Sequence, residues 1–296
     1  MWVASIGPLF DQLLADRMLS AKRDFRRGKL MHNRNADTVP TQRVTPEGVA
    51  PGERCVPVEM PIAISFLGIG YAVMMATPTD LEDFGIGFAL AERLIESIED
   101  VDGVSIEEAE GGVLLNLELV PARHDGLFGR VRHRVGDSSC GMCGIANLEQ
   151  ALRPLPRLAP PPKIARAEVF AALEIVREHQ PLNRQTGAVH AAALFSRAGK
   201  LVAVREDVGR HNAFDKLVGH CLREAIDPGA GFVLLTSRCS YELVEKAALA
   251  GVSLLVTVSA PTSLAVERAK EAGLTLMALA RSDEVLLLVD PHGLFE

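Results

Sequence analysis

Apolar residues follow two alternating patterns in the second half of the chain. Short apolar runs typical of buried strands alternate with segments in which apolar residues return every three or four positions. The expected helices span 164–180, 212–226, 241–251 and 263–273, and the expected strands span 188–196, 200–206, 232–237, 252–258, 274–280 and 284–290. The pattern predicts a largely parallel sheet covered by helices. A hairpin is expected where an Arg-Ala-Gly turn joins the first two strands.

The first half divides into three further regions. Residues 53–135 combine alternating strand-like runs at 55–68 and 111–120 with a helical pattern at 81–98, which predicts a smaller α+β region. Residues 136–162 hold a pair of cysteines and a proline-dense linker, which cannot keep regular structure. Residues 1–52 contain a basic run from Arg17 to Arg34 and a stretch rich in Pro, Thr and Gly. They are expected to form a largely disordered extension. The C-terminal α/β domain is assigned to 163–296.

Composition narrows the class of protein. The chain has 296 residues and a formal net charge of −7, which argues against general binding of nucleic acid. No apolar run is long enough to span a bilayer and the first residues do not resemble a signal peptide. We therefore expect a cytoplasmic protein that does not bind membranes.

Five cysteines are present, and two of them, Cys140 and Cys143, form a CxxC pair between glycines. A structural zinc ion needs four ligands, and only His124 and His133 lie nearby to complete such a set, at a spacing that matches no standard finger. A thioredoxin-like dithiol remains open, although the preceding segment is turn-like rather than a strand.

The third interpretation of the pair is a carrier thiol that holds sulfur as a persulfide. Glycines at 136, 141 and 144 give the backbone freedom, and the linker that follows allows the loop to swing. Two ordinary core cysteines are not expected here, because buried cysteines usually lie among apolar neighbours rather than among glycine and serine. We expect no structural metal.

Polar side chains gather where three of the expected strands end. The first group lies within 206–219 and includes Asp207, Arg210, His211, Asn212, Asp215 and Lys216. The second group, at 236–242, includes Arg238, and the third is the segment 278–283. Ligands of open α/β sheets bind beyond the carboxyl ends of strands, and cationic residues near helix N-termini there suit phosphate. The sequence therefore predicts a phosphate-binding edge with Arg210, His211, Lys216 and Arg238.

Six motifs in order carry a family resemblance over about residues 53–290. SSCGMCG, TGAVHAAALF, REDVGRHNAFDK, TSRCSYELVEKAA, SAPTSLAVERA and GLTLMALAR together resemble the formate dehydrogenase accessory sulfurtransferase family. The resemblance implies a homodimeric sulfur carrier with a cytidine-deaminase-like mixed sheet flanked by helices and a mobile CxxC loop. It implies a cysteine desulfurase as sulfur donor and formate dehydrogenase as the enzyme served. The acceptor implied is the molybdenum cofactor, bis-molybdopterin guanine dinucleotide, with molybdenum or tungsten.

The resemblance also assigns residues. Cys140 is the persulfide cysteine and Cys143 an assisting one. A cofactor-binding stretch matches the segment Leu279, Ala280, Arg281, Ser282, Asp283 and Glu284, although two acids close to phosphates weaken binding unless they face away. Zinc deaminases need H-x-E followed by P-C-x-x-C, whereas His190 is followed here by two alanines. The deaminase metal site is therefore absent from the sequence. A thiol-disulfide oxidoreductase and a cofactor-binding chaperone without sulfur transfer remain as alternatives.

Overall fold

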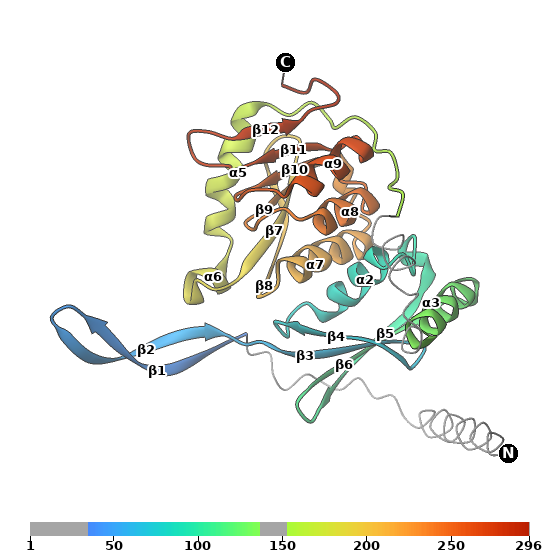
Figure 1. Cartoon of the computed structure of the whole chain (residues 1–296), viewed down its shortest axis with the longest axis horizontal. Coiled ribbons are helices and arrows are strands. Elements are labelled where there is room, and N and C mark those ends of the chain that lie inside the picture. The colour runs from blue at the N-terminus through green and yellow to red at the C-terminus, as the bar shows by residue number, and fades with distance from the viewer. Residues whose placement is uncertain (1–34, 137–152, 296) are drawn as a thin grey trace.

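A computed structural model describes residues 35–136 and 153–295 of the chain (Figure 1). Its largest element is a six-stranded sheet in the order β12-β11-β10-β9-β7-β8. The strands are β7 (His190–Ser196), β8 (Leu201–Asp207), β9 (Gly231–Leu235), β10 (Leu254–Thr257), β11 (Thr275–Ala278) and β12 (Leu286–Val289). β9, β10 and β11 are parallel, whereas the β7–β8, β7–β9 and β11–β12 pairs are antiparallel. The sheet is thus mixed rather than largely parallel, and the predicted hairpin is the β7–β8 pair.

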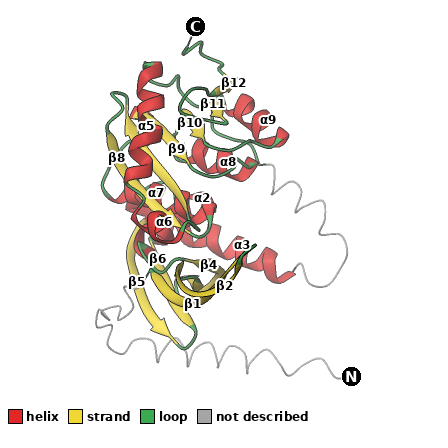
Figure 2. Ribbon diagram, turned by 90° about the vertical axis from the view of Figure 1, so that its left-hand side faces the viewer, coloured by secondary structure: helices red, strands yellow, loops and turns green. Residues whose placement is uncertain are grey.

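Helices cover both faces of this sheet (Figure 2). α5 (Arg166–Glu178) packs on one face through Val169, Leu173 and Val176, against Phe195 and Phe232, whose rings stack 5.3 Å apart. The other face is covered by α7 (Arg210–Arg223), α8 (Tyr241–Leu249) and α9 (Ser263–Ala272). Short segments complete the domain, namely α6 (Pro181–Thr186) and the 3-10 turn η3 (Pro228–Ala230).

A four-stranded sheet in the order β4-β3-β6-β5 forms the lower layer in Figure 1. Its strands are β3 (Met60–Phe66), β4 (Ile69–Ala76), β5 (Val101–Ala109) and β6 (Gly112–Leu119). α2 (Leu81–Ala91) lies between this sheet and α7, and the core is continuous across all three. The short turns η1 (Ile98–Asp100) and η2 (Pro121–Arg123) precede β5 and α3 (His124–Gly136) respectively. The region 53–135 and the C-terminal domain therefore share one hydrophobic core.

Residues 36–57 differ from the sequence expectation. β1 (Ala36–Thr45) and β2 (Gly48–Pro57) pair along their whole length and project from the body as a two-stranded arm (Figure 1). The expectation of a disordered extension is therefore wrong for residues 36–52. Arg54 holds the base of the arm by donating to the carbonyl of Thr186 at 2.5 Å. At the tip, Val44 and Val49 are 75% and 63% exposed, so the arm has no apolar core that a sequence pattern could show.

Candidate functional site

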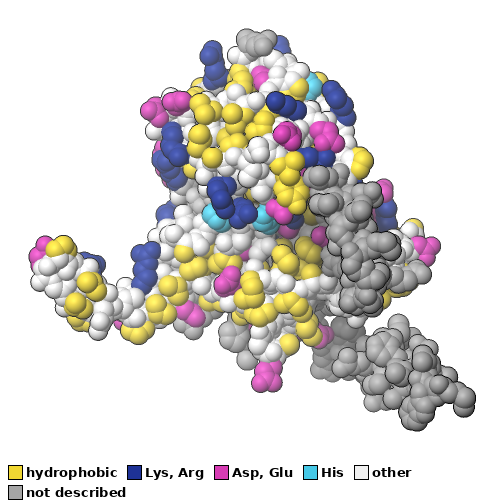
Figure 3. Space-filling view, viewed as in Figure 1, with side chains coloured by type: hydrophobic (Ala, Val, Ile, Leu, Met, Phe, Trp, Pro, Cys, Tyr) yellow, Lys and Arg dark blue, Asp and Glu magenta, His cyan; other side chains and the backbone are white. Residues whose placement is uncertain are grey.

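Five strand termini lie at one edge of the six-stranded sheet. Since β7 is antiparallel to β8 and β9, and β9, β10 and β11 are parallel, the start of β7 lies beside the ends of β8, β9, β10 and β11. We call this edge the strand-end face and define it by His190 and the segments 207–212, 236–242, 257–261 and 278–284. It brings the three polar groups of the sequence prediction to one edge. Histidines and basic side chains gather near the middle of the molecular face in Figure 3.

A buried polar network fixes the turn between β8 and α7. One carboxylate oxygen of Asp207 accepts from the Thr77 amide at 3.0 Å and lies 2.7 Å from the Lys216 ammonium. The other oxygen accepts from the Gly209 amide at 2.8 Å and the Asn212 side chain at 2.9 Å. The Thr77 hydroxyl accepts from the amide of Val208, so the turn is also tied to the chain that follows β4.

Lys216 does not occupy the position that the phosphate-binding prediction requires. Its side chain is fully buried, and its ammonium donates to the Thr77 carbonyl at 2.9 Å besides pairing with Asp207. Burial of a lysine is tolerated because the carboxylate and the carbonyl satisfy its charge and its donors. The structure therefore gives Lys216 a role in holding the turn. Asp215 is similarly buried and pairs with the ammonium of Lys246.

His190, Arg210 and Arg238 lie on neighbouring segments of the strand-end face. His190 pairs in register with Asp207 at the start of β7, and Arg210 is the first residue of α7. Burial lowers the pKa of His190, and the guanidinium groups of Arg210 and Arg238 lower this pKa further, against a smaller opposite effect of Asp207. Two arginines close to a neutral imidazole are an arrangement that suits an anion.

His211, beside this cluster, pairs with an acid from the next helix. Its Nε2 lies 3.4 Å from a carboxylate oxygen of Glu242, in the first turn of α8. Burial lowers the pKa of His211 to about 4, although Glu242 acts in the opposite direction. The imidazole is therefore neutral at neutral pH and acts as a hydrogen-bonding group rather than as a cation.

This lowered pKa predicts a pH dependence of stability. Between the unfolded pKa of 6.5 and the folded value of about 4, the unfolded chain binds a proton at His211 that the folded chain does not. The free energy of unfolding should therefore fall as the pH falls through this window, with a contribution approaching about 1.4 kcal/mol per pH unit. Urea unfolding of His211→Gln between pH 7 and pH 4.5 should show a shallower slope than that of the unaltered protein. Equal slopes for the two proteins would contradict a lowered pKa of His211 in the folded state.

The segment 279–284 forms a turn after β11. Leu279 adopts a left-handed backbone with φ of 53°. The amide of Arg281 donates to the Glu284 carbonyl at 2.7 Å, and its guanidinium donates to the carbonyls of Val258 and Ala280 at 2.6 and 2.9 Å. The side chain of Arg281 thus ties the end of β10 to this turn. Asp283 and Glu284 are exposed.

Cys140 and Cys143, the pair on which the functional prediction depends, lie outside the described residues. Of the cysteines within them, Cys55 is partly buried on β2, whereas Cys221 and Cys239 are buried. Burial raises the pKa of both Cys221 and Cys239 to about 12. Because the thiolate is the nucleophile, these two cysteines are poor candidates for sulfur chemistry.

The chain is anchored directly after the segment that holds the CxxC pair. The carbonyl of Arg153 accepts from the guanidinium of Arg268, which is buried and also pairs with Glu245 and Glu271. The carbonyl of Pro154 accepts from Arg93 at 3.0 Å. Residues 153–165 contain no helix or strand, as the proline-dense sequence predicts. Arg268 of α9 and Arg93, just after α2, therefore fix where this linker leaves the body.

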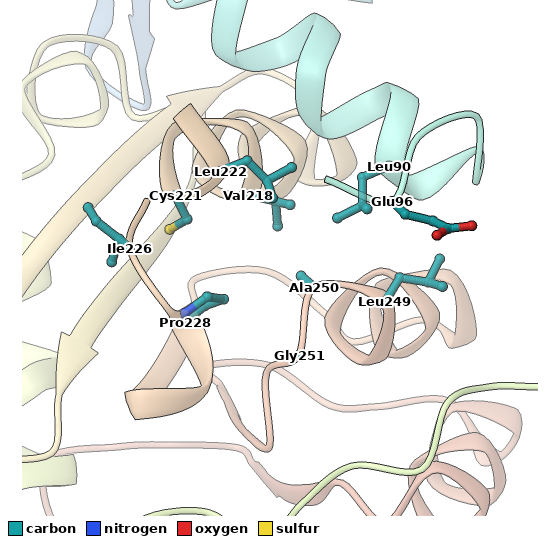
Figure 4. Close-up of a pocket in the computed structure, with 10 residues that line it drawn as sticks. All are labelled: Leu90, Glu96, Val218, Cys221, Leu222, Ile226, Pro228, Leu249, Ala250 and Gly251. Atoms are coloured by element: carbon teal, nitrogen blue, oxygen red, sulfur yellow. The ribbon is translucent and has the colours of Figure 1, made fainter. Parts of the chain in front are cut away.

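A cavity of about 230 Å³ lies away from the strand-end face (Figure 4). It is lined by Glu96 and by mainly apolar side chains around the C-terminal halves of α7 and α8, including Val218, Leu222 and Leu249. The polar residues that begin these helices lie at the opposite ends of α7 and α8. The cavity therefore belongs to a different part of the molecule from the predicted phosphate-binding edge.

The sequence pattern does not indicate two residues that matter at this edge. His190 belongs to the strand-end face, but the sequence singles it out only for its place in a deaminase-like pattern. Thr77 lies outside the face and contacts Asp207 from 130 residues earlier in the chain, so no local spacing signals their contact. Within residues 35–136 and 153–295, no group of three His, Cys, Asp or Glu side chains is placed to hold a metal ion. None of the helices in the same part of the chain has the length and apolar character needed to cross a bilayer.

Comparison with known proteins places this geometry in a family. Residues 57–294 match the model of the FdhD/NarQ family. Proteins named sulfur carrier protein FdhD are 44% identical in Agrobacterium fabrum, over 79% of this chain and 87% of the relative, and 44% identical in Xanthomonas euvesicatoria, over 81% and 85%.

A solved structure shares the fold. It belongs to a protein of Desulfotalea psychrophila described as a formate dehydrogenase accessory protein, with a TM-score of 0.71 and 25% identity, covering 87% of this chain and 98% of that one. The family match covers most of the chain, and the relatives exceed 40% identity over more than two thirds of it. The chain therefore belongs to the FdhD/NarQ family.

Proposed function

We propose that this protein is a sulfur carrier that holds sulfur as a persulfide on Cys140. The observation that carries the proposal is the match to relatives named sulfur carrier protein, combined with a CxxC pair in a glycine-rich segment. Two of the described cysteines are poorly suited to carry sulfur, which supports Cys140 as the persulfide residue. Cys221 and Cys239 are buried with raised pKa values, so few of their thiols ionise at neutral pH.

The transfer that loads the carrier follows from thiol chemistry. The thiolate of Cys140 attacks the terminal sulfur of a persulfide on the donor, a cysteine desulfurase. A sulfur–sulfur bond forms at Cys140, the donor's sulfur–sulfur bond breaks, and the donor cysteine leaves as a thiolate. Cys143 is the assisting cysteine. The step requires a nucleophile that can reach its donor.

The substrate that receives the sulfur is the molybdenum cofactor, bis-molybdopterin guanine dinucleotide, with molybdenum or tungsten. The strand-end face supports this proposal because Arg210 and Arg238 supply positive charge and His211 supplies a neutral hydrogen-bonding group. The turn at Leu279–Glu284 lies on the same face. Within this turn, the guanidinium of Arg281 donates to backbone carbonyls, so we propose that Arg281 stabilises the turn rather than binding the cofactor. The mixed sheet is compatible with a deaminase-like pocket that binds a guanine nucleotide and does not deaminate it.

The proposed setting is a cytoplasmic homodimer that receives sulfur from a cysteine desulfurase and serves formate dehydrogenase. Two alternatives predict different behaviour of the cysteines. A thiol-disulfide oxidoreductase needs Cys143 as much as Cys140, and a chaperone without sulfur transfer needs neither. No described residue favours either alternative over the carrier, and the relatives are named for sulfur carriage.

Replacing Cys140 by serine should abolish formate dehydrogenase activity in cells whose own carrier gene has been deleted. Serine keeps the size of the side chain but cannot form a persulfide. The matched control is Cys55→Ser on the projecting arm, which should restore activity as well as the unaltered chain. Binding of guanosine diphosphate to purified Cys140→Ser should persist. Full formate dehydrogenase activity with Cys140→Ser would contradict sulfur carriage.

A further inference from the structure

One face of the four-stranded sheet is buried and the other is open to solvent. Ile62, Ile64 and Leu115 point from β3 and β6 into the core on the side of α2 (Figure 1). Successive side chains of a strand point to opposite faces, so their neighbours lie on the other side of the sheet. We call that side the outer face and define it by its residues Pro61, Ala63, Val73, Met75, Glu107 and Leu114. None of these six side chains belongs to the hydrophobic core.

A continuous row of side chains crosses the outer face from one edge strand to the other. Ala63 of β3 is paired in register with Val73 of β4 and with Leu114 of β6. Leu114 is paired in turn with Glu107 of β5. Val73 and Leu114 are 67% and 46% exposed, so the row is apolar over three strands and ends in an acid. Contiguous exposed apolar side chains mark an interaction surface.

The chain enters the described structure beside this face. The carbonyl of Asn35 accepts from the amide of Val58 at 2.9 Å, two residues before β3 begins, close to the pair of Pro61 and Met75. Residues 1–34 precede this point and lie outside the described residues. An extended chain covers about 3.5 Å per residue, so residues 20–34 alone can span about 50 Å, whereas four strands are about 14 Å wide. Residues 1–19 can therefore reach any part of the outer face.

The sequence of residues 8–19 matches the order of side chains along the row. Its apolar residues recur at helical spacing, at Leu9, Phe10, Leu13 and Leu14. Arg17 follows Leu13 by one turn, on the same side of a helix. From Leu9 to Arg17 a helix rises about 12 Å, close to the width of the sheet. A helix this short is marginal in water by itself, so it depends on a surface against which its apolar side can pack.

We propose that residues 8–19 form a helix that packs across the outer face, with Leu13 over Ala63 and Arg17 beside Glu107. Apolar side chains then meet apolar side chains, and the cation meets the acid. The covalent tether at Asn35 keeps the segment at high local concentration. The outer face of a second copy is a poorer match, because it would bring another Glu107 and no cation from these six positions. The inference is independent of sulfur carriage, which concerns Cys140.

Hydrogen exchange of the full chain, followed by mass spectrometry of its peptides, tests the proposal. Amides of residues 10–19 should exchange at least about tenfold more slowly than those of an isolated peptide of the same sequence. The double variant Val73→Glu/Leu114→Glu should lose this protection, because it places charges where the apolar contacts form. The matched control is Val202→Glu on β8, where the valine is 43% exposed on the other sheet. This control should keep the protection.

Variants within the segment test the same contact without altering the sheet. Leu13→Asp should lose the protection, whereas Gln12→Asp, on the polar side of the helix, should keep it. Both variants introduce the same residue, so a difference between them reports the side of the helix that packs. Glu107→Arg should reduce the protection several-fold, and Arg17→Glu combined with Glu107→Arg should restore part of it, because the exchange of charges recreates the pair.

Three results would overturn the inference. The first is free exchange of residues 10–19 in the unaltered chain. The second is protection that persists in both Val73→Glu/Leu114→Glu and Leu13→Asp, since the segment would then pack elsewhere. The third is protection that appears only as the protein concentration rises, which would assign the outer face to a second copy of the chain.

Discussion

Gly219→Ala should destabilise the protein by about 4 kcal/mol or more, an exceptional loss for a single methyl group. A Cβ at Gly219 of α7 would lie 1.8 Å from the carbonyl oxygen of Asp83 on α2. The reciprocal position is equally close, since a Cβ at Gly87 would lie 1.8 Å from the carbonyl oxygen of Asp215. Backbone atoms cannot turn away as a flexible side chain can. The two helices must therefore separate, which opens the core around Phe84 and Leu217.

Gly129→Ala provides the matched control for this crossing. Gly129 lies within α3, and a Cβ there would meet no atom of the described residues within 4 Å. Alanine is the better helix former, so this variant should gain about 0.5–1 kcal/mol. Urea unfolding followed by circular dichroism measures both. Equal stabilities of Gly219→Ala and Gly129→Ala would contradict the close packing of α2 against α7.

Lys216→Met should lower the free energy of unfolding by about 3–5 kcal/mol, because it leaves the buried Asp207 carboxylate without its cation. Both side chains are fully buried, so water cannot replace the lost partner. The double variant Asp207→Asn/Lys216→Met should be less destabilised than the sum of the two single variants predicts, since the two residues act as a pair. Additive losses would contradict the buried pair.

Arg177→Met is the control for this ion pair. Arg177 and Glu174 form an ion pair 2.8 Å long, with 62% and 59% of their side chains exposed. Exposed pairs of this kind contribute little, so the variant should change the stability by less than about 1 kcal/mol. A loss in Arg177→Met as large as in Lys216→Met would show that burial does not govern the strength of these pairs.

The second half of the fold could be predicted from the sequence because its core elements carry strong periodic signals. β9, β10 and β11 are fully buried apolar runs, and α5 and α7 have apolar residues at helical spacing. Strand direction was harder to predict. The sequence predicts the β7–β8 hairpin. The apolar runs do not indicate that β7 lies between β8 and β9 and is antiparallel to both.

The projecting arm shows the limit of the same reasoning. β1 and β2 are rich in Thr, Pro and Gly, none of their residues is fully buried and most are exposed, so no alternation of apolar and polar residues marks them as strands. Their pairing with each other and the Arg54–Thr186 contact stabilise them instead. The contact between Arg54 and Thr186 joins residues 132 positions apart, which a local pattern cannot show.

The location of the strand-end face could be predicted from the sequence, but the orientation of its side chains could not. Three clusters of polar residues at strand ends correctly indicate one sheet edge. The sequence predicts that Lys216 faces a phosphate because Lys216 lies close to Arg210 and His211 near the start of a helix. In the structure its side chain instead points into the core and pairs with Asp207. Whether a charged side chain on α7 is buried depends on the chain at Thr77, which the sequence around Lys216 does not contain.

Intact-mass spectrometry after incubation with a cysteine desulfurase and free cysteine tests the central claim most directly. The account predicts a gain of one sulfur atom that a reductant removes and that Cys140→Ala does not acquire. Cys221→Ala should still acquire it, because the thiol of Cys221 is buried with its pKa raised to about 12. A protein that gains no sulfur, and that instead loses two hydrogens on mild oxidation, would contradict the carrier function and indicate a dithiol oxidoreductase.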